Sequence, residues 1–248
     1  LRVVSGELYC DDYHNLGTYV GTPETYFWPA FEAVVPTAND MPDRYDTNGP
    51  SSGVSNGIGA YVSGAGAQSI FSQAYEKVIH DSGDLNSVTI TDGSANSDKS
   101  NDAQLFVDWL TTAENDVGLL VMGDQVAYDL SLSEAAVATE FVTTICGVSL
   151  VDNSYYDITG GRDAGGVVTP LITGVTGGPF QGLTYYAYGG CFIINDFDVL
   201  EKNGPGEYAL QYPDFGGDSY YAGIYTRRLT GGLITLGAMW IALISMLI

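Results

Sequence analysis

A short apolar run, Val117–Gly123, limits the possible folds of this chain more than any other stretch. A run of this length without polar side chains predicts a strand that is buried on both faces. Apolar residues recur at helical spacing on either side of it, in Asp102–Thr112 and in Leu132–Ile145. A helix, a buried strand and a second helix in this order are typical of a parallel sheet.

Local signals set the limits of the second helix. Ser131 and Glu134 have the spacing of a capping box, which predicts that this helix begins just after Ser131. Gly147 follows its last apolar residues and predicts its end, because glycine commonly terminates helices.

The rest of the chain extends this pattern. Before the central unit we expect strands and helices in alternation, with strands at Leu1–Leu8, Asp43–Tyr45 and Tyr75–His80 and helices at Glu24–Val35 and Ala67–Ala74. Later, short apolar runs separated by Gly, Pro and Asn-Asp turns predict strands at Val148–Val151, Val167–Ile172, Leu183–Tyr188, Cys191–Ile194 and Tyr208–Gln211. The prediction is a single α/β domain over residues 1–248, with a mostly parallel central sheet, helices on both faces and a strand-rich second half. Because the chain begins within a predicted strand, we expect a mature form or a fragment of a longer polypeptide.

The last twenty residues, Leu229–Ile248, contain no charged side chain. Their length and apolar character fit a membrane-spanning helix, preceded by Arg227-Arg228. The alternative is a buried strand at Gly232–Gly237 that leads into an apolar helix. We favour the strand, because the predicted sheet needs a closing strand, and we therefore do not expect a membrane partner.

The formal net charge is −22, from 30 acidic and 8 basic side chains. A negative field of this size repels phosphate backbones, so we expect no nucleic-acid partner. The scarcity of lysine and the abundance of Ser, Thr, Asn and Asp favour a secreted protein with an extracellular or cell-surface location.

Three cysteines are present, and none of them forms a C-x-x-C motif. With only two histidines in the chain, we do not expect a zinc site. In an extracellular protein a pair of cysteines can form a disulfide. We favour Cys146, at the end of a predicted helix, with Cys191, at the start of a predicted strand; the alternative is three buried thiols.

Several segments together resemble a known superfamily. Tyr45–Gly53, Val78–Leu85 and Leu119–Asp129, with Gly147–Asp157 and Ala187–Val199, resemble the flavodoxin-like α/β domains of the class I glutamine amidotransferase-like superfamily. The version found inside large secreted bacterial proteins is the most similar. The resemblance implies a flavodoxin-like sheet.

The catalytic residues of that superfamily are missing. Its active members present a cysteine on a tight turn after a central strand, with a His-Glu pair later in the chain. Here Met122-Gly123-Asp124-Gln125 follow the strand, and no histidine occurs after His80. His80, Asp81 and Ser82 are consecutive, and neighbours in a strand point to opposite faces, so they do not predict a Ser-His-Asp triad. We therefore transfer no catalytic residue.

Four acidic residues follow two neighbouring predicted strands: Asp81 and Asp84 after one, Asp124 and Asp129 after the next. Because the carboxyl ends of parallel strands meet at one edge, these acids could form a Ca²⁺ site or a carboxylate pair for hydrolysis. The alternative, which we favour, is that Asp84 and Asp124 cap loops and helices and accept backbone N–H bonds.

Tyrosine is abundant, at 18 residues, and gathers in the second half of the chain. Weakly charged aromatic surfaces suit protein contacts. The residues that we single out are Tyr185, Tyr186, Tyr188, Tyr220 and Tyr221. We expect a non-catalytic extracellular or cell-surface structural module that binds copies of itself or other domains of the same polypeptide. The alternatives are a hydrolase that uses the four acids and a membrane-anchored ectodomain with a C-terminal span.

Overall fold

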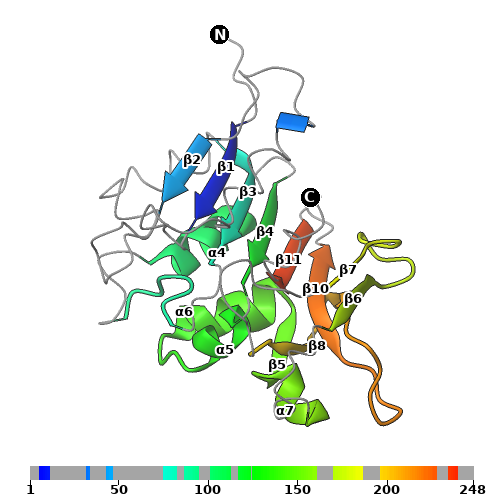
Figure 1. Cartoon of the computed structure of the whole chain (residues 1–248). Coiled ribbons are helices and arrows are strands. Elements are labelled where there is room, and N and C mark those ends of the chain that lie inside the picture. Colours follow the sequence, from blue (N-terminus) through cyan, green and yellow to red (C-terminus); the bar gives the residue numbers. More distant parts are fainter. Residues whose placement is uncertain are drawn as a thin grey trace, which may run out of the picture.

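The computed structural model describes residues 6–11, 32–33, 43–46, 75–82, 87–94, 101–112, 117–123, 125–160, 170–186, 196–227 and 234–239. These residues form an α/β structure in which eleven strands belong to one sheet (Figure 1). One part of the sheet is parallel and the other part is antiparallel, and the two parts meet at a single strand.

The parallel part contains five strands. In spatial order they are β2 (Asp43–Asp46), β1 (Gly6–Asp11), β3 (Tyr75–Asp81), β4 (Gly118–Met122) and β11 (Ile234–Met239). Every neighbouring pair among them is parallel. The predicted strand at Val117–Gly123 is confirmed, and it lies in the middle of the sheet with a partner on each side.

The antiparallel part begins at β11 and accounts for the strand-rich second half. It continues through β10 (Tyr221–Arg227), β9 (Gly206–Gln211), β6 (Leu171–Gly174) and β7 (Thr184–Tyr186). Off this path, β8 (Val199–Lys202) pairs with β10 and with β5 (Val148–Asp152). The sequence did not predict β8 or β10.

The C-terminal stretch contributes the strand that joins the two parts. β11 pairs with β4 on one side and with β10 on the other, so a strand in this stretch is confirmed, two residues later than predicted. The apolar helix expected after it lies outside the described residues. Among the residues described, no helix is long and apolar enough to cross a membrane.

The helices near β4 differ from the prediction at one point. α4 (Asp102–Thr112) has the predicted bounds. The single helix expected after Ser131 is instead α5 (Val126–Ser131), α6 (Ala136–Thr139) and the π-helical segment η2 (Glu140–Ile145).

The capping-box prediction is wrong, because Ser131 belongs to the last turn of α5. Its hydroxyl donates to the carbonyl of Tyr128 (2.7 Å), and the N-cap of α6 is Ala135, without a side-chain cap. Ser133 takes over part of the capping role, since its hydroxyl accepts the N–H of Ala135 (3.0 Å). Gly147 ends the helical stretch as predicted, at a φ of 68°.

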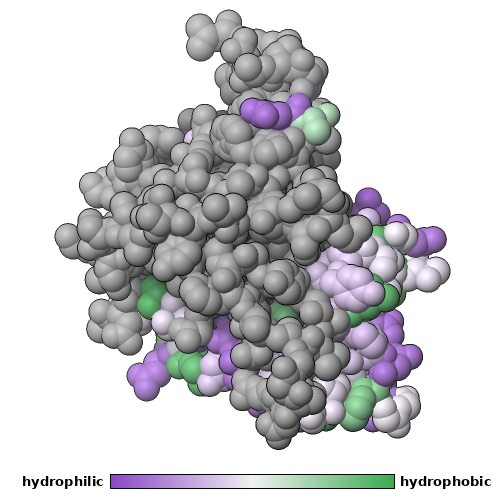
Figure 2. Space-filling model, viewed as in Figure 1, coloured by the Kyte–Doolittle hydropathy of each residue, from purple (hydrophilic) through white to green (hydrophobic). Residues whose placement is uncertain are grey.

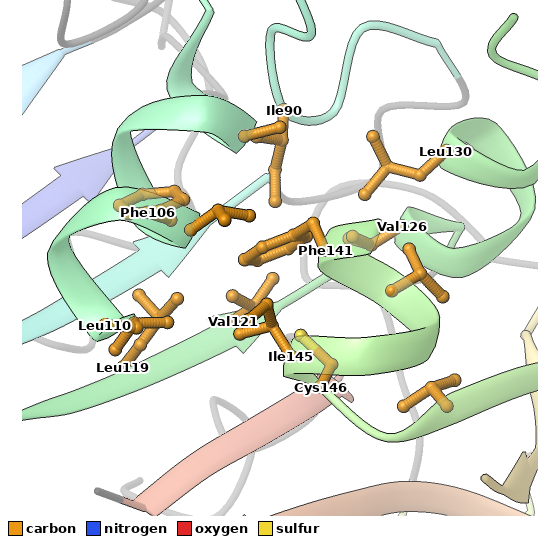
Figure 3. Packing of buried hydrophobic residues seen from close by; sticks show 14 of the residues in the cluster. Ile90, Phe106, Leu110, Leu119, Val121, Val126, Leu130, Phe141, Ile145 and Cys146 are labelled. Atoms are coloured by element: carbon orange, nitrogen blue, oxygen red, sulfur yellow. The ribbon is translucent and has the colours of Figure 1, made fainter. Parts of the chain in front are cut away.

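The apolar side chains of β4 alternate between two buried clusters. Leu119 and Val121 belong to the first, which contains residues of α4, α5, α6 and η2, including Phe106 and Phe141 (Figure 3). Met122 belongs to the second, and Leu120 packs against it.

The second cluster is built mainly by the antiparallel strands and by a short helix, α7 (Tyr155–Thr159). Of the early predicted helices, Glu32 and Ala33 are helical, and the remaining residues of Glu24–Val35 and all of Ala67–Ala74 lie outside the described residues. Helices on both faces of the parallel strands therefore stay a prediction.

Candidate functional site

The carboxyl edge of the parallel strands is the place where sheets of this kind bind ligands. Asp46, Asp11 and Asp81 end β2, β1 and β3, and their Cα positions are partners across the ladder. The strand order reverses direction here, because β1 is followed in the chain by β2 on one side and by β3 on the other. The backbone thus places three aspartates side by side at this edge, and the side chain of Asp81 is fully buried.

The turn after β4 is closed against the end of β3. Ser82 donates both its N–H (2.9 Å) and its hydroxyl (3.1 Å) to the carbonyl of Met122. A Cβ atom on Gly123 would collide with the Ser82 hydroxyl and would lie 2.8 Å from Val126. The position directly after the central strand therefore has no room for a nucleophilic side chain.

His80 has a role inside the fold. Its ring is buried, Nε2 donates to the carbonyl of Thr89 (3.0 Å), and its edge meets the ring of Phe106 at 5.7 Å between centroids. Because the Ser82 hydroxyl is directed to Met122, the structure gives His80 and Ser82 separate partners.

The polar loop 87–94 is fixed to the helices by its side chains. Thr89 donates its N–H and its hydroxyl to Asp129 Oδ2, both at 2.8 Å. Asp92 accepts the N–H of Ser94 (2.8 Å) and the hydroxyl of Ser133. Asp129, one of the four predicted ligand residues, is therefore an anchor for the loop. Asp84 and Asp124, for which the alternative interpretation expects backbone N–H bonds, lie outside the described residues.

The four predicted ligand residues are not shown to meet. Asp84 and Asp124 lie outside the described residues, Asp81 lies at the sheet edge, and Asp129 binds Thr89. Within the described part of the chain, no group of three or more His, Cys, Asp or Glu side chains has an arrangement that could hold a metal ion.

The sequence analysis missed Asp198. This residue precedes β8, and its side chain is 2% exposed. Its Oδ2 accepts the N–H groups of Ala127 (2.7 Å) and Tyr128 (3.1 Å) in the first turn of α5. The carbonyl of the same residue accepts the hydroxyl of Tyr212 (3.0 Å). Burial raises the pKa of the Asp198 carboxyl to about 8, against the lowering effect of the two N–H bonds.

No disulfide is seen among the described residues, and the pairing of Cys146 with Cys191 stays a prediction. Cys146 is buried within the first cluster (Figure 3), beside a small apolar cavity that Val121, Phe141 and Val148 also line. Cys191 lies outside the described residues. The apolar contacts of Cys146 explain its position, because a thiol packs as a small apolar group.

The tyrosines of the predicted surface differ in exposure. Tyr185 is 1% exposed and Tyr186 is 58% exposed, because neighbours in β7 face opposite sides of the sheet. Burial raises the pKa of the Tyr185 hydroxyl. Tyr220 and Tyr221 are half-buried, and Tyr188 lies outside the described residues.

Many tyrosines build internal contacts instead. The rings of Tyr155 and Tyr212 stack at 4.4 Å between centroids, and Tyr220 meets Tyr155 edge-on at 6.1 Å. The rings of Tyr208 and Tyr221 stack at 3.6 Å. These pairs hold the antiparallel strands together, which is the ordinary role of half-buried aromatic residues.

The hairpin between β9 and β10 presents an exposed aromatic residue that the sequence analysis did not select. It projects beyond the ends of the strands (Figure 1). At its tip, Phe215 and Asp218 exchange two backbone hydrogen bonds of 3.0 Å around Gly216 and Gly217, whose φ values of 66° and 98° fit a tight hairpin turn. Phe215 is 45% exposed.

The base of this hairpin is braced by side chains. Asp214 accepts hydrogen bonds from Gln211 and Ser219, both at 2.8 Å, and the Tyr155 hydroxyl donates to the carbonyl of Pro213 (2.8 Å). The tip is therefore an ordered support for Phe215.

Exposed apolar residues are otherwise dispersed. The large ones among the described residues are Leu132, Val151, Tyr186 and Phe215. Figure 2 shows hydrophobic residues of the visible face as separate spots among hydrophilic ones, outside the part drawn in grey.

Comparisons with known proteins give a limited result. No protein-family model and no curated protein matches the chain. The GH42 β-galactosidase Gan42B has 10% sequence identity and a TM-score of 0.47, over 94% of this chain and 27% of that one. A β-galactosidase from Rahnella sp. R3 has 10% identity and a TM-score of 0.44, over 95% and 29% of the two chains.

The N-terminal domain of mmIFT52 has 11% identity and a TM-score of 0.43, over 94% of this chain and 86% of that domain. The chain thus spans less than a third of the two β-galactosidases. At these levels of similarity the comparisons carry no argument about function.

Proposed function

We propose that this chain is a non-catalytic binding module of an extracellular or cell-surface assembly, which binds a second copy of itself or another domain of the same polypeptide. The observation that carries the proposal is the exposure of Tyr186 and Phe215 on ordered elements of the antiparallel part. Aromatic side chains that are held in place before binding lose little conformational entropy in a complex, so they are efficient contact residues.

The scaffold that we propose is flavodoxin-like and related to the glutamine amidotransferase-like domains. The parallel strands have the spatial order β2-β1-β3-β4-β11, which becomes 2-1-3-4-5 when they are numbered along the chain. The lack of space at Gly123 supports a non-catalytic member, since a nucleophile after the central strand has no place there. The acidic, lysine-poor composition supports the extracellular location.

The test measures self-association of the full chain by light scattering after gel filtration, over a wide range of protein concentrations. We expect the mass to rise with concentration for the wild type and to stay at the monomer value for the double variant Tyr186→Ser, Phe215→Ser. Leu132→Ser is the matched control, because Leu132 is 65% exposed and lies directly after α5, outside the antiparallel strands. A wild type that stays monomeric throughout, or a Leu132→Ser variant that dissociates as the double variant does, would contradict self-assembly through these residues.

A second candidate function is a metal-dependent or carboxylate-based hydrolase. Its support is the alignment of Asp46, Asp11 and Asp81 at the carboxyl edge of the sheet. Carboxylate oxygens are the ligands that Ca²⁺ prefers. If this function is correct, CaCl₂ raises the melting temperature of the wild type and not that of Asp81→Asn; equal shifts for both proteins count against it.

A further inference from the structure

Asp198 connects the two parts of the molecule. The antiparallel part supplies the residue, and its carboxyl binds the first turn of α5, which packs in the first cluster against the parallel strands. The backbone next to Asp198 is also attached to α7, because the carbonyl of Phe197 accepts the N–H of Tyr155 (3.0 Å). A change in the charge of this carboxyl therefore acts on the contact between the two parts.

Among the described residues, the surroundings of the carboxyl contain negative charge and no neutralising partner. Asp129, on α5, is the acidic group that acts on it electrostatically, and Tyr212 contributes a phenol that binds the Asp198 carbonyl. Asp196 and Glu201 are the other acidic residues of the segment 196–202, which carries Asp198. Among the described residues no basic side chain pairs with Asp198, and Oδ1 has no hydrogen-bond partner.

Two opposing effects act on the proton of this group. The N–H groups of Ala127 and Tyr128 favour the carboxylate, because they donate to its charged form. Burial of a charge without a cation favours the neutral acid, and so does the neighbouring Asp129. Burial is the larger effect, and it raises the pKa to about 8.

We propose that Asp198 is a proton-dependent link between the antiparallel part and α5: in its protonated form it connects them without a buried charge, and loss of the proton leaves an uncompensated charge that destabilises the junction. The orphan oxygen Oδ1 carries the argument together with the burial of the side chain. A neutral acid leaves one buried polar group unsatisfied, whereas a carboxylate leaves a buried charge, and the charge is far more costly.

The direction of the pH effect distinguishes this proposal from an ordinary anchoring carboxylate. The folded protein holds the Asp198 proton up to about pH 8, whereas an unfolded chain releases it near pH 4. The unfolded state therefore binds fewer protons in this window, and stability decreases as pH rises from about 4 to about 8. A carboxylate stabilised by its two N–H bonds would give the opposite sign, with stability lost on acidification.

The experiment compares urea unfolding of the wild type and of Asp198→Asn from pH 5 to pH 9. Asparagine keeps the shape of the neutral acid and cannot ionise. We expect the midpoint of the wild type to fall relative to that of the variant as the pH rises from 5 to about 8, with the wild type becoming the less stable protein. Asp218→Asn is the matched control, because it removes one exposed acid at the hairpin tip, and its profile should run parallel to that of the wild type.

Two outcomes overturn the proposal: parallel profiles of the wild type and Asp198→Asn, or a wild type that gains stability relative to the variant as pH rises. If Asp198→Asn does not fold, the ¹³C shift of the Asp198 carboxyl carbon in the wild type decides. A titration midpoint above pH 6 supports the link, and a midpoint near pH 4 overturns it. Neither readout involves self-association, so this inference stands or falls separately from the proposed function.

Discussion

The parallel strands and the antiparallel strands treat their polar and apolar side chains in opposite ways. At the carboxyl end of β3, the polar residues His80, Asp81 and Ser82 are fully buried. On the antiparallel part, the apolar side chains of Val151, Tyr186 and Phe215 are exposed. The end of β3 keeps its polar groups inside the scaffold, whereas the antiparallel part, which also buries Asp198, displays apolar contact groups on the surface.

The difference follows from sheet architecture. A parallel strand that is covered on both faces has no solvent side, so polar groups at its end must find partners within the protein. Antiparallel strands at the end of a sheet can leave one face in water, which permits an exposed ring on every second residue. We therefore expect substitutions in the buried clusters to lower stability and substitutions of the exposed aromatic residues to leave it nearly unchanged.

The largest effect is expected in the core beside the parallel strands. Phe141 is fully buried and packs against Phe106 at 5.9 Å between ring centroids. Phe141→Ala should lower the free energy of unfolding by about 3–5 kcal/mol, because it leaves a cavity that the neighbours fill only in part. Urea unfolding measures this value, and a loss below about 1 kcal/mol would mean that this cluster does not carry the fold.

A smaller effect is expected where the end of η2 meets β9. Gly147 has a φ of 68°, and a Cβ atom there would lie 2.7 Å from the backbone nitrogen of Gly206. Gly147→Ala should cost about 2 kcal/mol or more, from the left-handed backbone and the collision together. Gly160→Ala is the matched control, since Gly160 has the same φ of 68° with nothing within 4 Å. Its cost should be about 1 kcal/mol, and equal losses in the two variants would show that the contact with Gly206 is unimportant.

The anchor of the polar loop ranks next. Thr89→Val keeps the size of the side chain and removes the hydroxyl that binds Asp129. We expect a loss of about 1.5 kcal/mol, because the hydrogen bond goes to a charged acceptor. Thr111→Val, at an exposed helix position, should change stability by less than about 0.5 kcal/mol. If the unfolding midpoints of the two variants do not differ, the hydrogen bond between Thr89 and Asp129 does not contribute to stability.

The smallest effect on stability is expected for the exposed aromatic residue of β7. Tyr186→Ser should change the free energy of unfolding by less than about 0.5 kcal/mol, because the ring is mostly in solvent. The same substitution should lower self-association. A variant that loses stability by more than 1.5 kcal/mol, measured in the same urea experiment, would place Tyr186 with the core residues and would break the separation between the two parts.

The sequence predicted the strands whose burial is visible as a local pattern. The apolar run at Val117–Gly123 and the strand at Tyr75–His80 are in the sheet as expected. β10 escaped prediction because Gly223 interrupts it and a register shift disturbs the alternation of side chains there. β8 escaped because its four residues change from buried to exposed halfway along.

The candidate site was harder to predict, because tertiary contacts create it. Asp198 reads as a turn residue in the sequence, and its burial depends on α5, which lies 71 residues earlier in the chain. Likewise, alternation in β7 predicts that Tyr185 and Tyr186 face opposite sides, but only the assembled sheet decides which ring is exposed. The capping-box prediction was wrong for a local reason, because Ser131 lies in α5 and its hydroxyl donates to the carbonyl of Tyr128 there.

The place of β11 in the sheet has a consequence for how the chain is synthesised. β4 acquires its second neighbour only when residues 234–239 have emerged, long after β3 has become available to pair with it. Until then one edge of the apolar strand β4 is open, and exposed apolar edges are prone to pair with other chains. During translation, a nascent chain of this protein is therefore prone to aggregate until β11 pairs with β4.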